Sequence, residues 1–211
     1  MRYGNVPNWL RKLEKHLGFL SLPNLALYIT VLQVFGIITL YLKPHAIDTL
    51  FLIPQKVIEG EIWRIFTFMA IPLTGGFWII IVLFFLYFII NTLEKEWGHF
   101  PTTFYLLISV VLTNVFAFTF DVVIHEFTPI KMTLFLAAAT TFPEMEILMF
   151  FFPVRLKWLG ILSAAAYVYY FINGGNLYKL YLLAVFSNYF IFFGPAFIYK
   201  LKQAYNRKKF K

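Results

Sequence analysis

The chain has 211 residues, of which 61% are hydrophobic, 21% aromatic and 13% charged, with a formal net charge of +8. This composition is far more apolar than that of a soluble domain and predicts an integral membrane protein. It also excludes nucleic acid as the expected partner, because the basic residues flank apolar segments, where they suit membrane orientation and attraction to anionic lipid.

Residues 1–22 are predicted to form an amphipathic segment that lies on a membrane surface. Apolar side chains recur there at helical spacing, at Trp9, Leu10, Leu13, Leu17 and Leu20. Several positions between them are basic, which suits the headgroup region of a bilayer. No small-residue cleavage pattern ends the apolar segment that follows, so we expect this segment to be kept as a membrane span rather than removed as a signal peptide.

Six apolar stretches follow, at residues 24–42, 77–93, 101–120, 128–142, 158–172 and 177–199. Most approach the roughly 20 residues that an α-helix needs to cross a bilayer. The stretches at 128–142 and 158–172 are shorter, so they must lie inside a bundle, stand in a thinned bilayer or extend past these bounds. We therefore predict an all-α protein whose membrane domain, residues 23–200, is a bundle of six transmembrane helices, followed by a basic tail at 201–211.

Six spans place both termini on the same side of the membrane, and the basic residues indicate which side this is. Most of the 18 Lys and Arg residues fall on the side of the termini. Those expected on the opposite side are Lys43, Lys56, Arg64, Lys131 and Lys179. Because basic loops tend to stay in the cytoplasm, we predict that both termini and the amphipathic segment are cytoplasmic.

The loop after the fourth span carries acidic residues at its start and basic residues at its end. Glu144 and Glu146 follow Pro143, and Arg155 and Lys157 precede the fifth span. We expect a turn after Pro143 at the cytoplasmic face, with ion pairs between the two sets of charges. These charges therefore need no functional explanation.

Two further patterns flank the second span. Trp63 and Arg64 are adjacent in the loop before it, and Glu94 and Gly98 lie at its end. Together with the loop at 142–158, in this order and spacing, they resemble the rhomboid superfamily, including its protease-inactive, derlin-like members, over roughly positions 61–199. In that family the Trp-Arg loop is a partly embedded hairpin on the non-cytoplasmic side, and a Gly-x-x-x-Glu-x-x-x-Gly pattern organises the end of span two. The resemblance implies architectural roles for these four residues, with Ile90 in place of the first glycine.

The chemistry of a rhomboid protease is missing from the chain. Active members use a serine at the start of span four with a histidine on span six as its base, because a hydroxyl needs a positioned base to act as a nucleophile. Here no serine occurs between Ser109 and Ser163, and no histidine occurs after His125. The histidine and asparagine that would hold the oxyanion are also missing between Glu61 and Ile90. We therefore predict no enzymatic activity, no catalytic residue and no cofactor.

Two other chemistries were weighed against this prediction. Threonines in or near the fourth span could replace the serine, although membrane threonines more often bond a backbone carbonyl or a neighbouring helix. Asp121 and His125 are four residues apart and could share a helix face near Glu126, His45 and Asp48, which are potential metal ligands. No His-Glu-x-x-His spacing supports such a site, so we expect no metal.

Flexible segments before span two and between spans five and six lie where a rhomboid-like bundle could open sideways, although both could be simple turns. Polar side chains inside the spans could bond a helix of a bound protein or a helix of this bundle. The candidate gate or client-contact residues are Pro72, Gly75, Gly76, Trp78 and Asn188.

The hypothesis that follows is a catalytically inactive rhomboid-like protein that binds the transmembrane helices of client membrane proteins, in quality control, trafficking or degradation. Its expected partners are these helices and the lipid bilayer. A prokaryotic plasma membrane is favoured over the endoplasmic reticulum as its location. The alternatives are an atypical intramembrane hydrolase and a structural or transport subunit of a membrane complex.

Overall fold

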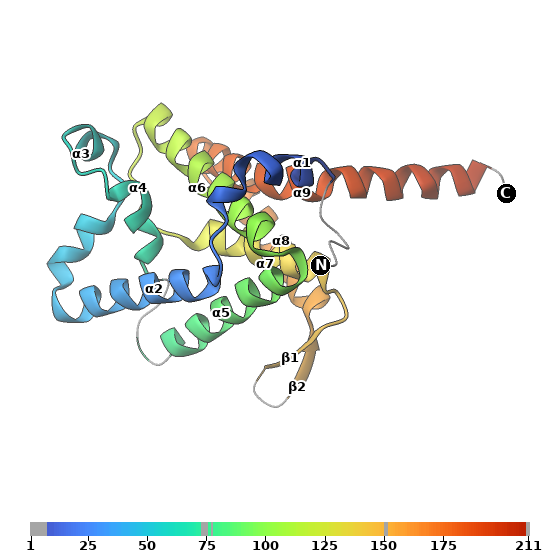
Figure 1. Cartoon of the computed structure of the whole chain (residues 1–211), viewed down its shortest axis with the longest axis horizontal. Helices are drawn as coiled ribbons and strands as arrows, with labels where there is room; N and C mark the ends of the chain where they lie inside the picture. Colours follow the sequence, from blue (N-terminus) through green and yellow to red (C-terminus); the bar gives the residue numbers. More distant parts are fainter. Residues whose placement is uncertain (1–7, 73–75, 77, 150–151, 210–211) are drawn as a thin grey trace.

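The computed structural model describes residues 8–72, 76, 78–149 and 152–209 (Figure 1). The longer helices are α1 (Asn8–Leu17), α2 (Leu25–Leu42), α5 (Trp78–Trp97), α6 (His99–Phe120), α7 (Thr128–Thr141), α8 (Leu156–Asn173) and α9 (Asn176–Lys209). Short helical turns lie between them, at η1 (Gly18–Leu20), η2 (Pro44–Leu50), α3 (Pro54–Ile58), α4 (Arg64–Thr67) and η3 (Phe68–Ala70). An antiparallel hairpin joins α7 to α8 through β1 (Glu146–Met149) and β2 (Phe152–Arg155). Apart from this hairpin, the described chain is all-α, as the sequence predicts.

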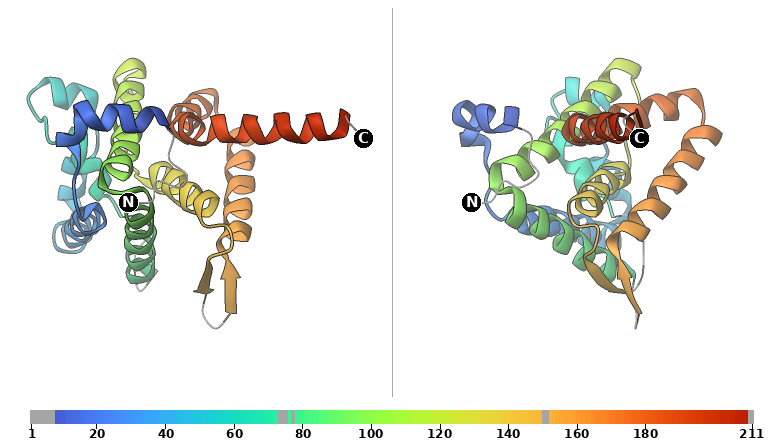
Figure 2. Two further views of the ribbon diagram at one scale, coloured as in Figure 1. Left: turned by 45° about the vertical axis from the view of Figure 1, so that its right-hand side comes forward. Right: turned by 90° about the vertical axis from the view of Figure 1, so that its right-hand side faces the viewer.

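The short helix α7 lies at the centre of the bundle. It packs against α5, α6, α8 and α9, and Figure 2 shows it between α5 and α8. Its fully buried positions are Ile130, Thr133, Leu134, Ala137 and Ala138. Small and apolar side chains at these positions let the neighbouring helices approach closely on several sides. The helix α2 lies outside this group and packs mainly on α5.

Successive long helices run in alternating directions, so the molecule has two distinct ends. At one end, which we call the Arg64 end, Leu52 and Ile124 exchange backbone hydrogen bonds of 3.0 and 2.9 Å. At the other, which we call the Glu94 end, the Leu25 N–H donates to the Glu94 carboxylate at 3.3 Å. The loops 43–67 and 121–127 lie at the Arg64 end, and the β1–β2 hairpin lies at the Glu94 end.

Within the described residues, four helices are long and apolar enough to cross a membrane, namely Leu25–Leu42, Trp78–Trp97, His99–Phe120 and Asn176–Pro195. They support a membrane protein by their length and composition. The helix α7 has only 14 residues, fewer than a span needs. The helix α8 has 18 residues, but its tyrosines, Lys157 and Asn173 lower its mean hydropathy, and it is not among the four candidate spans. Four of the six predicted spans are therefore candidate membrane-spanning helices. The crossings of α7 and α8 stay a prediction.

Both ends of the described chain are helical. In α1, Leu10 is buried, and the Trp9 ring lies 5.6 Å from the Phe192 ring between centroids, so this helix packs on α9 as well as carrying a polar face. The helix α9 continues to Lys209, through most of the segment predicted as a tail. Pro195 lies inside α9 and removes a backbone donor, which bends helices. Figure 2 shows the two parts of α9 pointing in different directions, and the second part projects beyond the rest of the molecule in Figure 1.

The predicted ion pairs after Pro143 are present in the hairpin. Glu144 contacts Lys157 at 2.6 Å and Arg155 at 3.0 Å, and Glu146 contacts Arg155 at 3.4 Å. Glu146 and Arg155 are also directly opposite each other in the strand register. The turn was predicted, whereas the two short strands were not.

Candidate functional site

Arg64 fastens the loop that joins α2 to α5. Its guanidinium donates to the carbonyl oxygens of Asp48 at 2.7 Å and Phe51 at 2.9 Å, and it pairs with the Glu61 carboxylate at 2.6 Å. The Arg64 side chain is only 6% exposed. The planar guanidinium can serve all three acceptors at once, which a lysine cannot do. Trp63, the preceding residue, is instead half exposed.

Glu94 and Gly98 shape the connection between α5 and α6. The buried Glu94 carboxylate accepts the Leu25 N–H and also contacts Nδ1 of His99 at 2.5 Å. It thereby ties the end of α5 to the starts of α2 and α6. Gly98 has a φ of +94°, a conformation that L side chains rarely adopt. Both residues therefore stabilise the connection between α5 and α6.

The predicted gate residues before α5 lie in different surroundings. Pro72 is half-buried, whereas Trp78 is the first residue of α5 and is exposed. Gly76 has a φ of +71°, and its N–H donates to the Tyr41 hydroxyl at 2.8 Å. This bond ties the segment before α5 to the last turn of α2. Gly75 lies outside the described residues.

Asn188 is a contact inside the bundle rather than on its surface. The residue is fully buried, and its amide nitrogen donates to the Tyr105 carbonyl and to the Ser109 hydroxyl, both at 2.8 Å. It therefore joins α9 to α6. A direct contact between Asn188 and a client helix does not fit this placement, and of the two roles considered from the sequence the structure shows the bond within the bundle.

Three threonine hydroxyls of α7 form bonds to the helix backbone. Thr133, Thr140 and Thr141 each donate to a carbonyl oxygen three or four residues earlier, at 2.8–2.9 Å. The Thr140 hydroxyl also lies 2.6 Å from the Tyr189 hydroxyl. In the part of the chain that the structure describes, no histidine or carboxylate bonds these hydroxyls. This arrangement offers no base that would make them nucleophiles.

Asp121 and His125 do not share a helix face. The helix α6 ends at Phe120, and Asp121 follows it in a left-handed conformation with a φ of +50°. Asp121 is bonded by the side chain of Gln55 instead. The described residues contain no group of three His, Asp or Glu side chains that could hold a metal ion. The helix face considered for these two residues therefore does not form, because α6 ends before them at a left-handed residue.

One face of α7 is left partly open by the neighbouring helices. Phe135, Leu136 and Ala139 are 7–8% exposed, whereas the positions behind them are fully buried. Lys131 and Met132, one turn nearer the Arg64 end, are half-buried. Spacings of three and four residues place these five side chains on one side of the helix. We call this face the α7 strip.

The helices α5 and α8 border the α7 strip. Phe85 of α5 lies against Phe135, with 5.6 Å between ring centroids. On the α8 side, a Cβ added to Gly160 would lie only 2.7 Å from the Cβ of Ala139. The approach of α8 is therefore close near the Glu94 end, and the exposure of the α7 strip rises at Lys131 and Met132, in the part of the space between α5 and α8 that lies nearer the Arg64 end.

A polar link between α2 and α7 was not foreseen from the sequence. The buried Gln33 side chain accepts a hydrogen bond from Lys131 Nζ at 2.9 Å and donates to the carbonyl oxygens of Met69 and Ile71. The available signals were a glutamine inside an apolar span and a lysine at the start of another. From the sequence, Lys131 indicates only the orientation of the chain in the membrane.

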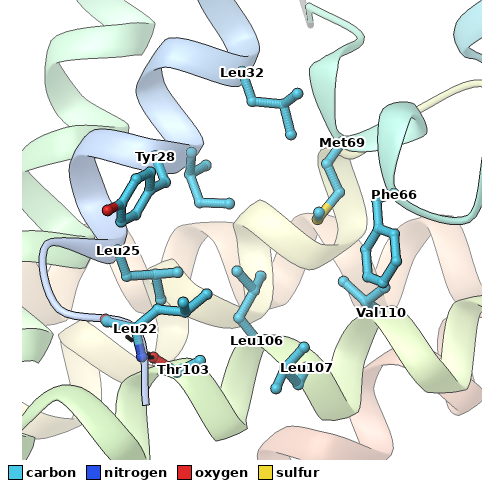
Figure 3. A pocket seen from close by; sticks show the side chains of 11 residues that line it. Leu22, Leu25, Tyr28, Leu32, Phe66, Met69, Thr103, Leu106, Leu107 and Val110 are labelled. Atoms are coloured by element: carbon cyan, nitrogen blue, oxygen red, sulfur yellow. Dashed lines mark hydrogen bonds between the residues drawn. The ribbon is translucent and has the colours of Figure 1, made fainter. Parts of the chain in front are cut away.

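Hollows also lie away from the α7 strip. An apolar cavity of about 270 Å³ lies between α2 and α6, walled by residues that include Leu25, Leu32, Phe66, Met69 and Val110 (Figure 3). A more polar hollow of about 440 Å³ surrounds Glu94 and His99 at the Glu94 end. Neither is lined by residues of α7 or α8, so neither belongs to the gap between α5 and α8.

Comparisons with family models, curated proteins and solved structures found no match to this chain. The resemblance to the rhomboid superfamily therefore rests on the motifs of the sequence and stays a prediction.

Proposed function

We propose that this protein is a catalytically inactive, rhomboid-like membrane protein of six spans that binds transmembrane helices of other membrane proteins and acts in their quality control, trafficking or degradation. In this proposal α2, α5, α6, α7, α8 and α9 are the spans. The Arg64 end faces away from the cytoplasm, and the Glu94 end faces it.

The observation that carries the proposal is the α7 strip between α5 and α8. This face of the central helix is less completely covered than its other faces, and its exposure rises from 7–8% at Phe135, Leu136 and Ala139 to half-buried at Lys131 and Met132. The flanking helices present large exposed apolar side chains, such as Phe84 on α5 and Leu162 on α8. In lipid, a further helix can gain packing contacts with such a face, and packing is what drives helix association there.

The sequence supports the inactive character of the site. The start of α7 carries no serine, and α9 carries no histidine. The hydroxyls of Thr133, Thr140 and Thr141 are bonded to the backbone of α7. A site of this kind can hold a helix without cutting it. The hydrolase alternative has no specific observation in its favour.

The experiment is photocrosslinking in the native membrane from the α7 strip. A photoreactive amino acid replaces Met132 or Leu136 in the full chain, and captured proteins are identified by mass spectrometry. The matched control carries the same group at Val31 of α2, which is 58% exposed. Because Leu136 is only 8% exposed, random collisions would favour the control position.

We expect several different single-span proteins to be captured from the strip and not from Val31. One constant partner at every position would instead indicate a subunit of a fixed complex. Equal capture from the strip and from Val31 would contradict the proposal, since it would reflect only exposure to the membrane.

A further inference from the structure

Lys131 lies in the first turn of α7, at the Arg64 end of the α7 strip. Its Nζ donates to Oε1 of Gln33 at 2.9 Å and lies 5.4 Å from the centroid of the Phe127 ring. Gln33 is held in turn by the Met69 and Ile71 carbonyl oxygens, to which its amide nitrogen donates. The ammonium group is therefore positioned by a neutral side chain that is itself fixed. Lys131 as a whole residue is half-buried, so it is not sealed inside the bundle.

The charge of Lys131 has no anionic partner among the described residues. No carboxylate there lies within 4.0 Å of its Nζ, and Glu126, whose charge acts on it, makes no ion pair with it. An ammonium group has three donors, and the structure uses one of them for Gln33. The first turn of a helix carries a partial positive charge, so the dipole of α7 disfavours a cation at this position.

A cation kept in apolar surroundings without a counter-ion is costly, and such residues inside membranes usually have a function. Gln33 is neutral, so its hydrogen bond orients the Lys131 ammonium group without neutralising its charge. By helical spacing Lys131 lies on the same face of α7 as Met132 and Phe135, which is the face that a bound helix would touch.

We propose that Lys131 binds a carboxylate in the client helix, so that the protein selects transmembrane helices with an aspartate or glutamate near their non-cytoplasmic end. This inference rests on the proposed function, because it names the class of client that the α7 strip accepts. A carboxylate on a client helix in lipid is poorly solvated, as the Lys131 ammonium group is. An ion pair between them offsets the desolvation cost of both charges, and it gives specificity that apolar packing alone does not provide.

The test uses full-length protein in liposomes and a synthetic transmembrane peptide of leucine and alanine. The peptide carries aspartate, asparagine or leucine near its non-cytoplasmic end, and binding is measured by energy transfer between dyes. We expect the aspartate peptide to bind at least roughly tenfold more tightly than the leucine peptide. Lys131→Gln is expected to abolish this preference and Lys131→Arg to keep it. The asparagine peptide separates the contribution of charge from that of hydrogen bonding.

The outcomes separate this inference from the function on which it rests. Equal binding of the aspartate and leucine peptides to the wild type would overturn the role of Lys131 and leave helix binding intact. A preference for aspartate that persists in Lys131→Gln would also overturn it. If none of the peptides binds, both proposals fail. Unfolding of each variant is followed in parallel. If Lys131→Gln does not fold, equal binding of the three peptides to the wild type still overturns the inference, and loss of the preference in a folded Lys131→Met supports it.

Discussion

Two buried charged side chains, Arg64 and Glu94, hold the connections at opposite ends of the bundle. Each bonds backbone groups at helix ends, the carbonyl oxygens of Asp48 and Phe51 in one case and the Leu25 N–H in the other. In apolar surroundings an unbonded backbone group is costly. These charges therefore stabilise irregular backbone next to the membrane, which explains why both can be buried.

Replacement of Arg64 tests this role. Arg64→Ala is expected to lower the free energy of unfolding by about 2–4 kcal/mol, because two carbonyl oxygens and Glu61 lose a charged donor. Unfolding of the purified protein in mild detergent, followed by circular dichroism, measures the change. Lys56→Ala is the control, since Lys56 lies in the same loop but forms only an exposed pair with Glu59. If the two variants unfold alike, the loop does not depend on Arg64.

At the scale of elements, the packing of α7 against α8 depends on small side chains. Gly160 faces Ala139, and any Cβ at Gly160 would come within 2.7 Å of the Ala139 side chain. This contact closes the gap between α5 and α8 near the Glu94 end. A larger residue there must move one helix away from the other.

Gly160→Val is expected to destabilise the protein by about 1–3 kcal/mol, as overpacking does. The control is Gly18→Val in η1, where no atom lies within 4 Å of an added Cβ. Both changes place a β-branched residue in a helical turn, so the extra loss at Gly160 reports the contact with α7. Thermal unfolding in detergent measures both. Equal losses would show that α7 and α8 can separate at no cost.

The β1–β2 hairpin is expected to open in acid. Lys157 donates a hydrogen bond to the Glu144 carboxylate, which lowers the pKa of Glu144 below its usual value of 4.5. A group with a lower pKa in the folded state stabilises that state above the unfolded pKa, so this contribution is lost as the pH falls below 4.5. Hydrogen exchange of the Leu156 N–H, which donates to the Met145 carbonyl at 2.8 Å, should then exceed the rate expected from pH alone. The acid-dependent excess should vanish in Glu144→Gln, and its persistence there would assign it to another group.

At the scale of the whole molecule, the long helices could be predicted from the sequence because continuous apolar runs dictate them. The stretch at 24–42 became α2 almost unchanged, and the turn at Gly174 and Gly175 ends α8 as expected. The hairpin was missed, since its strands are four residues long and apolar, like the end of a span. The link between Gln33 and Lys131 was missed because it joins residues 98 positions apart. Which side chain meets which neighbour across helices is decided by tertiary packing, and no local pattern encodes it.

The number of spans is the last property of the whole molecule to test. The chain has no cysteine, so single cysteines can be labelled without background. We would place one at His125, Glu146 or Gly175, all of which are exposed, and treat intact cells with a membrane-impermeant maleimide. If α7 and α8 both cross the bilayer, positions 125 and 175 are labelled from outside, and position 146 is labelled only after permeabilisation. If only α2, α5, α6 and α9 cross, all three positions lie on the same side and behave alike. That result would leave α7 and α8 outside the bilayer, and the gap between α5 and α8 would then not be open to a transmembrane helix.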